Sequence, residues 1–125
     1  MIYEMKLDPK PFELIKSKEK KVELRLNDAK RQKLAKGDDI LFISNANENE
    51  KIAVTIKGLH KYPSFAELFT YIEPELCGYD PGTTVKEAVN EMRKYYSEEQ
   101  ETNYGVVGIE VAITDLEFVM RQLEK

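Results

Sequence analysis

Three charged residues, Lys20, Glu23 and Arg25, lie close enough in the sequence to contact the same ligand. A carboxylate beside two cations can contact an anionic or amide-bearing group, and a lysine against a carboxylate can act as an acid–base pair if burial shifts its pKa. In a strand, Glu23 and Arg25 leave on the same side, roughly 7 Å apart. Lys20 is out of phase with them and joins Glu23 only if residues 18–20 form the turn that enters the strand.

The strand itself is predicted by the alternation of Val22, Leu24 and Leu26 with polar residues. A period of two indicates one buried face and one polar face. Two interpretations of the polar face remain open, a solvated edge strand with a surface Arg–Glu ion pair or one wall of a ligand site. A concave pocket in which the three charged side chains converge would favour the ligand site, and side chains pointing to open solvent would favour the surface pair.

The spacing Lys20-x-x-Glu23-x-Arg25 resembles the signature of the ASCH family, a set of small β-barrel domains similar to the PUA domain of RNA-modifying proteins. The similarity continues in order through residues 62–68, 95–99 and 104–110. It implies an α+β fold, a PUA-like small β-barrel with inserted short helices, as a single domain over 1–125. The family usually has glycine two residues before the motif lysine. Lys18 stands there, which predicts a differently shaped turn with an added positive charge at its mouth.

Composition agrees with one globular domain. The 125 residues are 42% hydrophobic and 34% charged, with no apolar run of membrane length and no signal-peptide pattern at the start. We therefore expect a cytoplasmic protein with no membrane association. The single cysteine, Cys77, excludes an internal disulfide, and with His60 as the only histidine we expect no zinc site, no other metal and no cofactor.

The charge distribution predicts a directed anionic ligand. The net charge of −4 argues against a protein that coats nucleic acid without specificity, because such binding needs many lysines and arginines. Residues 16–36, however, hold nine Lys or Arg against three acids, a local balance of +6. A basic patch on an otherwise acidic chain suits one anionic partner.

The remaining elements follow from periodicity and capping residues. We expect a helix after Asp8-Pro9, helical turns over 29–34, a helix from Phe65 capped by Ser64, and a strand at 106–113 broken by Gly108. Residues 74–82 have no periodicity and form a loop of a length that is often functional. The other predicted elements are strands at 1–7, 40–43 and 51–59, helices capped by Thr84, Ser97 and Asp115, and a polar loop at 45–49.

The resemblance implies a cleft between the barrel and its inserted helices that binds RNA or a nucleotide-like small molecule. Lys20, Arg25, Lys30 and Arg31 would contact phosphate there. Tyr79 or Tyr104 would stack on a base, and Glu23 would accept a hydrogen bond from a base or ribose edge. Asp80, on the same loop as Tyr79, completes the predicted ligand-binding set. The oligomeric state is not predicted.

A small hydrolase acting on RNA or a modified nucleoside is the alternative, with Lys20 and Glu23 as its catalytic residues. One ASCH branch comprises amidohydrolases that deacetylate a modified cytidine nucleoside with a lysine, a threonine and a glutamate. Lys20 matches the lysine. Glu23 occupies the threonine position, and Asp80 and Pro81 lie near the place of the glutamate. Two of the three positions therefore differ, which counts against that specific activity but leaves amidohydrolase- or ribonuclease-type chemistry open.

Overall fold

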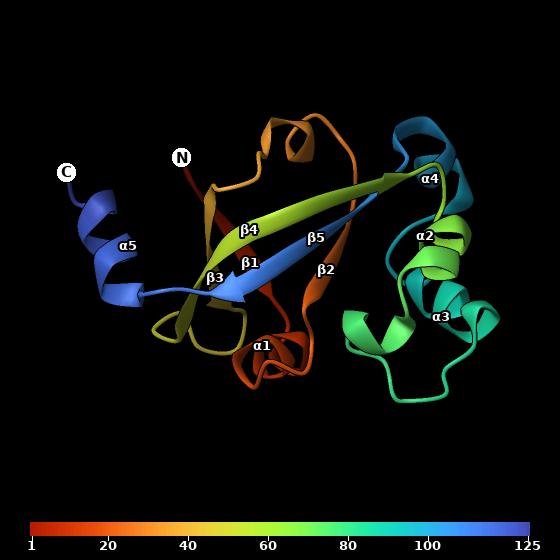
Figure 1. Ribbon diagram of the computed structural model, residues 1–125, viewed down its shortest axis with the longest axis horizontal. Coiled ribbons are helices and arrows are strands. Elements are labelled where there is room, and N and C mark those ends of the chain that lie inside the picture. Colours follow the sequence, from red (N-terminus) through yellow and green to blue (C-terminus); the bar gives the residue numbers. More distant parts are fainter.

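A curled five-stranded sheet forms the centre of the protein, described over residues 1–125 by a computed structural model (Figure 1). The strand order is β1-β3-β4-β5-β2, with β1 and β3 parallel and the other neighbours antiparallel. The strands are β1 (Ile2–Leu7), β2 (Val22–Leu26), β3 (Asp39–Ser44), β4 (Lys51–Tyr62) and β5 (Val106–Ile113). β1 and β2 are thus the two outer strands, and the predicted α+β class is confirmed.

Helices cover the sheet at three places. In Figure 1, α2, α3 and α4 gather at one end, α5 lies at the opposite end and α1 packs beside the lower ends of β1 and β2. The helices are α1 (Pro9–Lys16), α2 (Phe65–Tyr71), α3 (Val85–Met92), α4 (Glu98–Tyr104) and α5 (Leu116–Leu123), and short 3-10 turns are η1 (Arg31–Lys33) and η2 (Pro74–Cys77). We call residues 65–104 the helical unit. None of the helices combines the length and the apolar character needed to cross a membrane.

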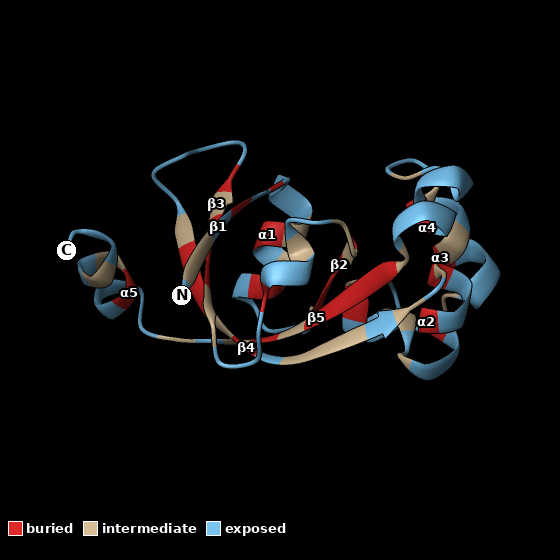
Figure 2. Ribbon diagram, turned by 90° about the horizontal axis from the view of Figure 1, so that it is seen from above, coloured by how far each residue is buried: buried red, intermediate tan, exposed pale blue.

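Two hydrophobic clusters divide the interior. The larger, of 13 residues, lies on the inner side of the curl, where Phe12 and Ile15 of α1 pack against the strands. The second, of 10 residues, joins the apolar face of β2 to the helical unit. β5 contributes to both clusters and is the most continuously buried strand (Figure 2). β2 therefore packs on the helical unit with one face and on the interior of the curled sheet with the other.

β5 is continuous through Gly108, so the predicted break at this residue is wrong. A Cβ at Gly108 would lie 3.0 Å from Val22 Cγ1 and 3.3 Å from Leu68 Cδ1. The absent side chain thus lets β2 and α2 approach the strand closely. The irregularity in the sheet lies instead in β4, whose register with β5 shifts between Ile56 and Gly58.

Helix starts follow the sequence closely. Ser64, Thr84, Ser97 and Asp115 each accept a hydrogen bond from the backbone N–H three residues on, as predicted. Asp8 precedes α1 but makes no such bond, and its carboxylate accepts from Asn45 Nδ2 at 2.9 Å instead. The turns predicted over 29–34 form only the short η1.

The turn before β2 contains the one non-glycine residue with a positive φ, Lys18 at 70°. This left-handed conformation is the one that glycine favours, because an L side chain crowds the following carbonyl there. Lys18 therefore adopts the backbone conformation expected of a glycine at this position. The differently shaped turn predicted from the presence of a lysine does not form. The turn places Lys20 beside Glu23.

Replacing Lys18 by glycine should raise the free energy of unfolding by about 0.5 to 1 kcal/mol, because the relief of left-handed strain exceeds the added entropy of the unfolded chain. Urea denaturation measures the change. Lys18→Ala removes the same charge but keeps the Cβ, so it should give no such gain. An equal gain in both variants would assign the effect to charge and contradict the strain argument.

Candidate functional site

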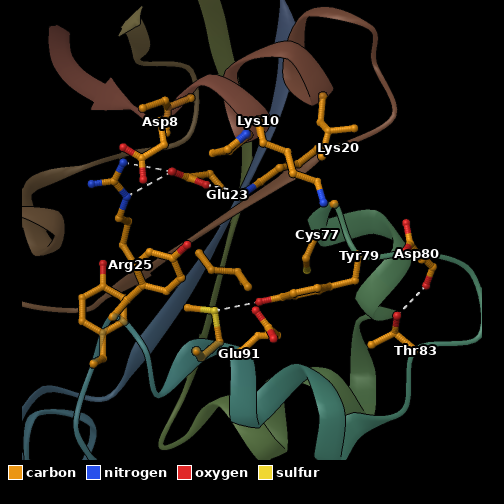
Figure 3. A pocket seen from close by; sticks show the side chains of 18 of the residues that line it. Asp8, Lys10, Lys20, Glu23, Arg25, Cys77, Tyr79, Asp80, Thr83 and Glu91 are labelled. Carbon is orange, nitrogen blue, oxygen red and sulfur yellow. Dashed lines mark hydrogen bonds and ion pairs between the residues drawn. The ribbon is translucent and has the colours of Figure 1, made fainter. Parts of the chain in front are cut away.

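A cavity of about 780 Å³ lies between the barrel and the helical unit (Figure 3). Its volume falls within the range of small-molecule sites, about 300 to 1,000 Å³. α1, the end of β1 and β2 form one side, and the η2–α3 segment with the residues after α3 forms the other. Five of the eight predicted site residues line it: Lys20, Glu23, Arg25, Tyr79 and Asp80.

The Glu23 carboxylate is the centre of a buried ion triad formed with Lys20 and Arg25. Lys20 Nζ lies 2.7 Å from Glu23 Oε1. Arg25 donates to Glu23 Oε2 from Nε at 3.1 Å and from a terminal nitrogen at 2.9 Å. Glu23 is only 4% exposed, yet each of its oxygens has a cationic partner. The three motif residues therefore converge in a concave site.

Strand pairing explains how the polar face of β2 becomes buried. Glu23 pairs with Ile109 and Arg25 with Val107 of β5, and directly opposed residues of antiparallel strands share a face. Ile109 and Val107 belong to the core cluster inside the curl. The opposite, apolar face of β2 packs on the helical unit. Both faces are therefore covered, and the solvated-strand interpretation is wrong.

The ionisation of Glu23 is set by two opposing effects. Burial alone would raise its pKa, but the nearby charges of Lys20 and Arg25 and their hydrogen bonds lower the pKa below its ordinary 4.5. Glu23 is therefore a carboxylate at neutral pH. A general base works best with a pKa near the working pH, so this environment suits Glu23 to holding charge rather than accepting a proton.

The backbone around Lys20 is fixed by contacts with two other segments. The Lys20 amide donates to the Leu14 carbonyl of α1 at 2.9 Å, and the Lys21 amide donates to Leu76 of η2 at 2.8 Å. Gly78 has a φ of +95°, and a Cβ there would lie 3.0 Å from Lys20 Cδ. Glycine at position 78 thus adopts the positive φ without steric strain and leaves room for the aliphatic part of the Lys20 side chain.

Arg25 also connects the two outer strands of the sheet. Besides its bonds to Glu23, it donates from a terminal nitrogen to the Lys6 carbonyl of β1 at 3.1 Å. β1 and β2 are not paired with each other, so this side chain bridges the open side of the curled sheet. The position of the guanidinium at the cavity wall is therefore determined from two sides.

Tyrosines form much of the opposite side. Tyr79 donates to Met92 Sδ at 3.1 Å and meets Phe69 edge-on, with ring centroids 5.9 Å apart. Tyr96 stacks on Phe65, also at 5.9 Å. Burial raises the pKa of both tyrosine hydroxyls, which keeps them protonated. These two rings are thus held rigidly.

Neither a thiol nucleophile nor a metal centre is evident. Burial raises the pKa of Cys77, which lines the cavity, to about 12, so the thiolate is scarce at neutral pH. No three His, Cys, Asp or Glu side chains gather in a way that could hold a metal ion.

Three predicted site residues lie outside the cavity lining. Lys30 is exposed, Arg31 pairs with Asp28 at 3.3 Å on the η1 side, and Tyr104 is half-exposed at the end of α4. The structure therefore does not gather the basic stretch 16–36 around one site. Sequence reasoning missed lining residues from other segments: Lys6, Asp8, Lys10, Asn45, Thr83, Glu87, Asn90, Glu91, Tyr95 and Tyr96.

Only part of that missed set left a signal in the sequence. Glu87, Asn90 and Glu91 are spaced three and four residues apart, so they share one polar face of α3, beside its buried Ala88 and Met92. The spacing could have identified this face, but not the cavity that it borders. No local pattern indicates that α1 lies across from α3.

Comparison with known proteins gives a consistent picture. The sequence model of the ASCH domain matches residues 5–115. No match was found among curated proteins. The crystal structure of hypothetical protein PH0355 is 39% identical, with 91% of this chain and 100% of that chain covered and a TM-score of 0.80. The solution structure of PF0455 from Pyrococcus furiosus is 34% identical, with coverages of 92% and 99% and a TM-score of 0.66.

A more distant structure has the same fold. A mutant of ZmASCH from Zymomonas mobilis is 14% identical, covers 91% of this chain and 75% of its own, and has a TM-score of 0.54. At this identity the similarity concerns the fold alone. It confirms the predicted PUA-like architecture, here an open, curled sheet with helices at its ends.

Glu23→Gln should lower the free energy of unfolding by about 3 to 5 kcal/mol at pH 7, because it leaves two largely buried cations without their counter-charge. The folded pKa of Glu23 lies below 4.5, so its stabilisation is present above that pH and is lost as the pH falls through the folded value. The difference from the wild type should therefore narrow below pH 4.5. Chemical denaturation at several pH values measures it.

Glu4→Gln serves as the control, because Glu4 is an exposed strand residue whose carboxylate has no ion-pair partner. It should change the free energy of unfolding by no more than about 0.5 kcal/mol at any pH. A loss for Glu23→Gln that stays constant down to pH 2 would contradict the assignment of the stabilisation to the ionised carboxylate.

Proposed function

The chain belongs to the ASCH domain family, and on that premise we propose that it binds RNA, or a free nucleotide, by enclosing one unpaired nucleotide in the cavity. The observation that carries the proposal is the convergence of Lys20, Glu23 and Arg25 on one concave, tyrosine-lined site. A buried ionisable group whose pKa is shifted and that lines a cleft marks a candidate functional site, and Glu23 has these features.

The size and lining of the cavity suit a single nucleotide. A volume of about 780 Å³ admits a base with its ribose but not a double helix. Proteins read unpaired RNA by stacking bases on aromatic rings and by hydrogen bonds to their edges. Tyr95, 64% exposed and lining the cavity, offers a free ring for stacking, whereas Tyr79 and Tyr96 already pack on phenylalanines.

Exposed cationic side chains that line the cavity are the best candidates for contacting a phosphate. Glu23 already neutralises much of the charge of Lys20 and Arg25, although both keep N–H groups that can donate to a ligand. Lys10 lines the cavity, is exposed and has no recorded ion pair. We therefore assign the leading phosphate contact to Lys10, with Lys20 and Arg25 as donors deeper in the site.

No observation favours the hydrolase alternative. Glu23 has a lowered pKa, and both of its oxygens are occupied by cations. The cavity also lacks a second carboxylate paired with Lys20. Binding without turnover is the simpler use of this arrangement.

Lys10→Met and Lys30→Met test the proposed site, because each removes one exposed lysine charge but only Lys10 lines the cavity. With AMP and a five-nucleotide single-stranded RNA as probes, Lys10→Met should weaken binding about 3- to 10-fold and Lys30→Met less than 2-fold. Isothermal titration calorimetry measures both. A larger effect of Lys30→Met would place the ligand on the η1 surface and contradict the proposal.

The salt dependence gives an independent prediction for single-stranded RNA. With one phosphate engaged, affinity should fall only about 3-fold between 50 and 200 mM salt, from a slope of about −0.7 per phosphate. A 100-fold loss would require the extended basic surface that the fold does not assemble.

A further inference from the structure

The two walls of the cavity carry opposite charge (Figure 3). The wall made by β1, α1 and β2 holds four cations and two acids, Lys6, Lys10, Lys20 and Arg25 with Asp8 and Glu23. The wall made by the helical unit holds three acids and no lysine or arginine, namely Asp80, Glu87 and Glu91. Figure 3 shows Lys10 and Lys20 on one side of the site and Glu91 on the other. An anionic group is therefore favoured at the first wall and disfavoured at the second.

The acidic wall also contributes every tyrosine of the cavity: Tyr79, Tyr95 and Tyr96. Ring faces attract cations through their negative quadrupole, and carboxylates beside the rings add to the attraction. Phe69 and Phe65 hold two of these rings in place, so the surface needs little rearrangement. A wall of aromatic rings and carboxylates is suited to a positively charged group.

One carboxylate on this wall has no partner of its own. Glu91 pairs with Lys94 at 2.9 Å, and Glu87 accepts from the Thr84 amide at 3.0 Å. The Asp80 carboxylate makes no hydrogen bond or ion pair. The neighbouring Thr83 hydroxyl donates to the Asp80 backbone carbonyl and not to its side chain. Glu87 likewise has no cationic partner, but Asp80 is the one acid of this wall with neither a cation nor a hydrogen-bond donor beside its carboxylate, which is exposed at the cavity lining.

We propose that the cavity selects a zwitterionic nucleotide, whose phosphate lies toward Lys10 and Lys20 and whose base or substituent carries a positive charge toward Asp80 and the tyrosines. The inference rests on the proposed function and names the class of ligand for the same site. It assigns Asp80 as a specificity-determining residue, through its charge rather than through any role in the fold.

Two isomeric nucleotides provide the test. 1-Methyladenosine 5′-monophosphate carries a positive charge on its base at neutral pH, and N6-methyladenosine 5′-monophosphate has the same substituent on an uncharged base. Calorimetry at one ionic strength should show the cationic isomer binding about 5- to 10-fold more tightly, as expected for one cation that contacts aromatic rings and an exposed carboxylate. Asp80→Asn should remove most of this preference, because the cationic isomer then loses its carboxylate partner.

Glu99→Gln is the matched control, because it removes one exposed acid from the helical unit without touching the cavity lining. It should keep the full preference. Equal affinity of the wild type for the two isomers would overturn the inference and leave the proposed function intact. Binding of neither isomer, together with no binding of AMP or RNA, would overturn both. A preference that survives Asp80→Asn unchanged would overturn the role of Asp80.

Discussion

The burial of Glu23 between Lys20 and Arg25 connects the segments that border the cavity. Removing a carboxylate from water costs several kcal/mol, and only close, hydrogen-bonded cations offset that cost. Each cation is held from elsewhere, Lys20 by a turn bonded to α1 and η2, and Arg25 by the carbonyl of Lys6. The ion triad therefore fixes β2 relative to α1, β1 and the helical unit, the segments that border the cavity.

The sequence predicted local structure well and the surroundings of the site only in part. The alternation at 22–26 and the capping residues Ser64 and Thr84 act over a few positions, so pattern identified them. The contact between Lys20 and Glu23 was also predictable, given a turn at 18–20. The burial of Glu23 was not, because a period of two separates two faces but does not say what covers each one.

The positive charge of residues 16–36 in the sequence did not predict the charge around the cavity. Lys30 and Arg31 follow Arg25 closely in sequence, but η1 carries them away from the cavity lining. The acidic and aromatic wall comes from residues more than fifty positions after the motif, which no local pattern connects to it. A site that appeared basic in the sequence is therefore mixed in the folded protein, and that mixture is what limits the choice of ligand.

The proposed function requires a nucleotide to bind against the ion triad inside the cavity. An NMR titration with AMP tests this binding, following the side-chain Nε–H signal of Arg25 together with the backbone amides. We predict saturable shifts of the Arg25 signal and of the amides of Gly78 and Tyr96, with the amides of residues 29–33 unmoved. Shifts confined to 29–33, or none at millimolar AMP, would contradict the proposed binding.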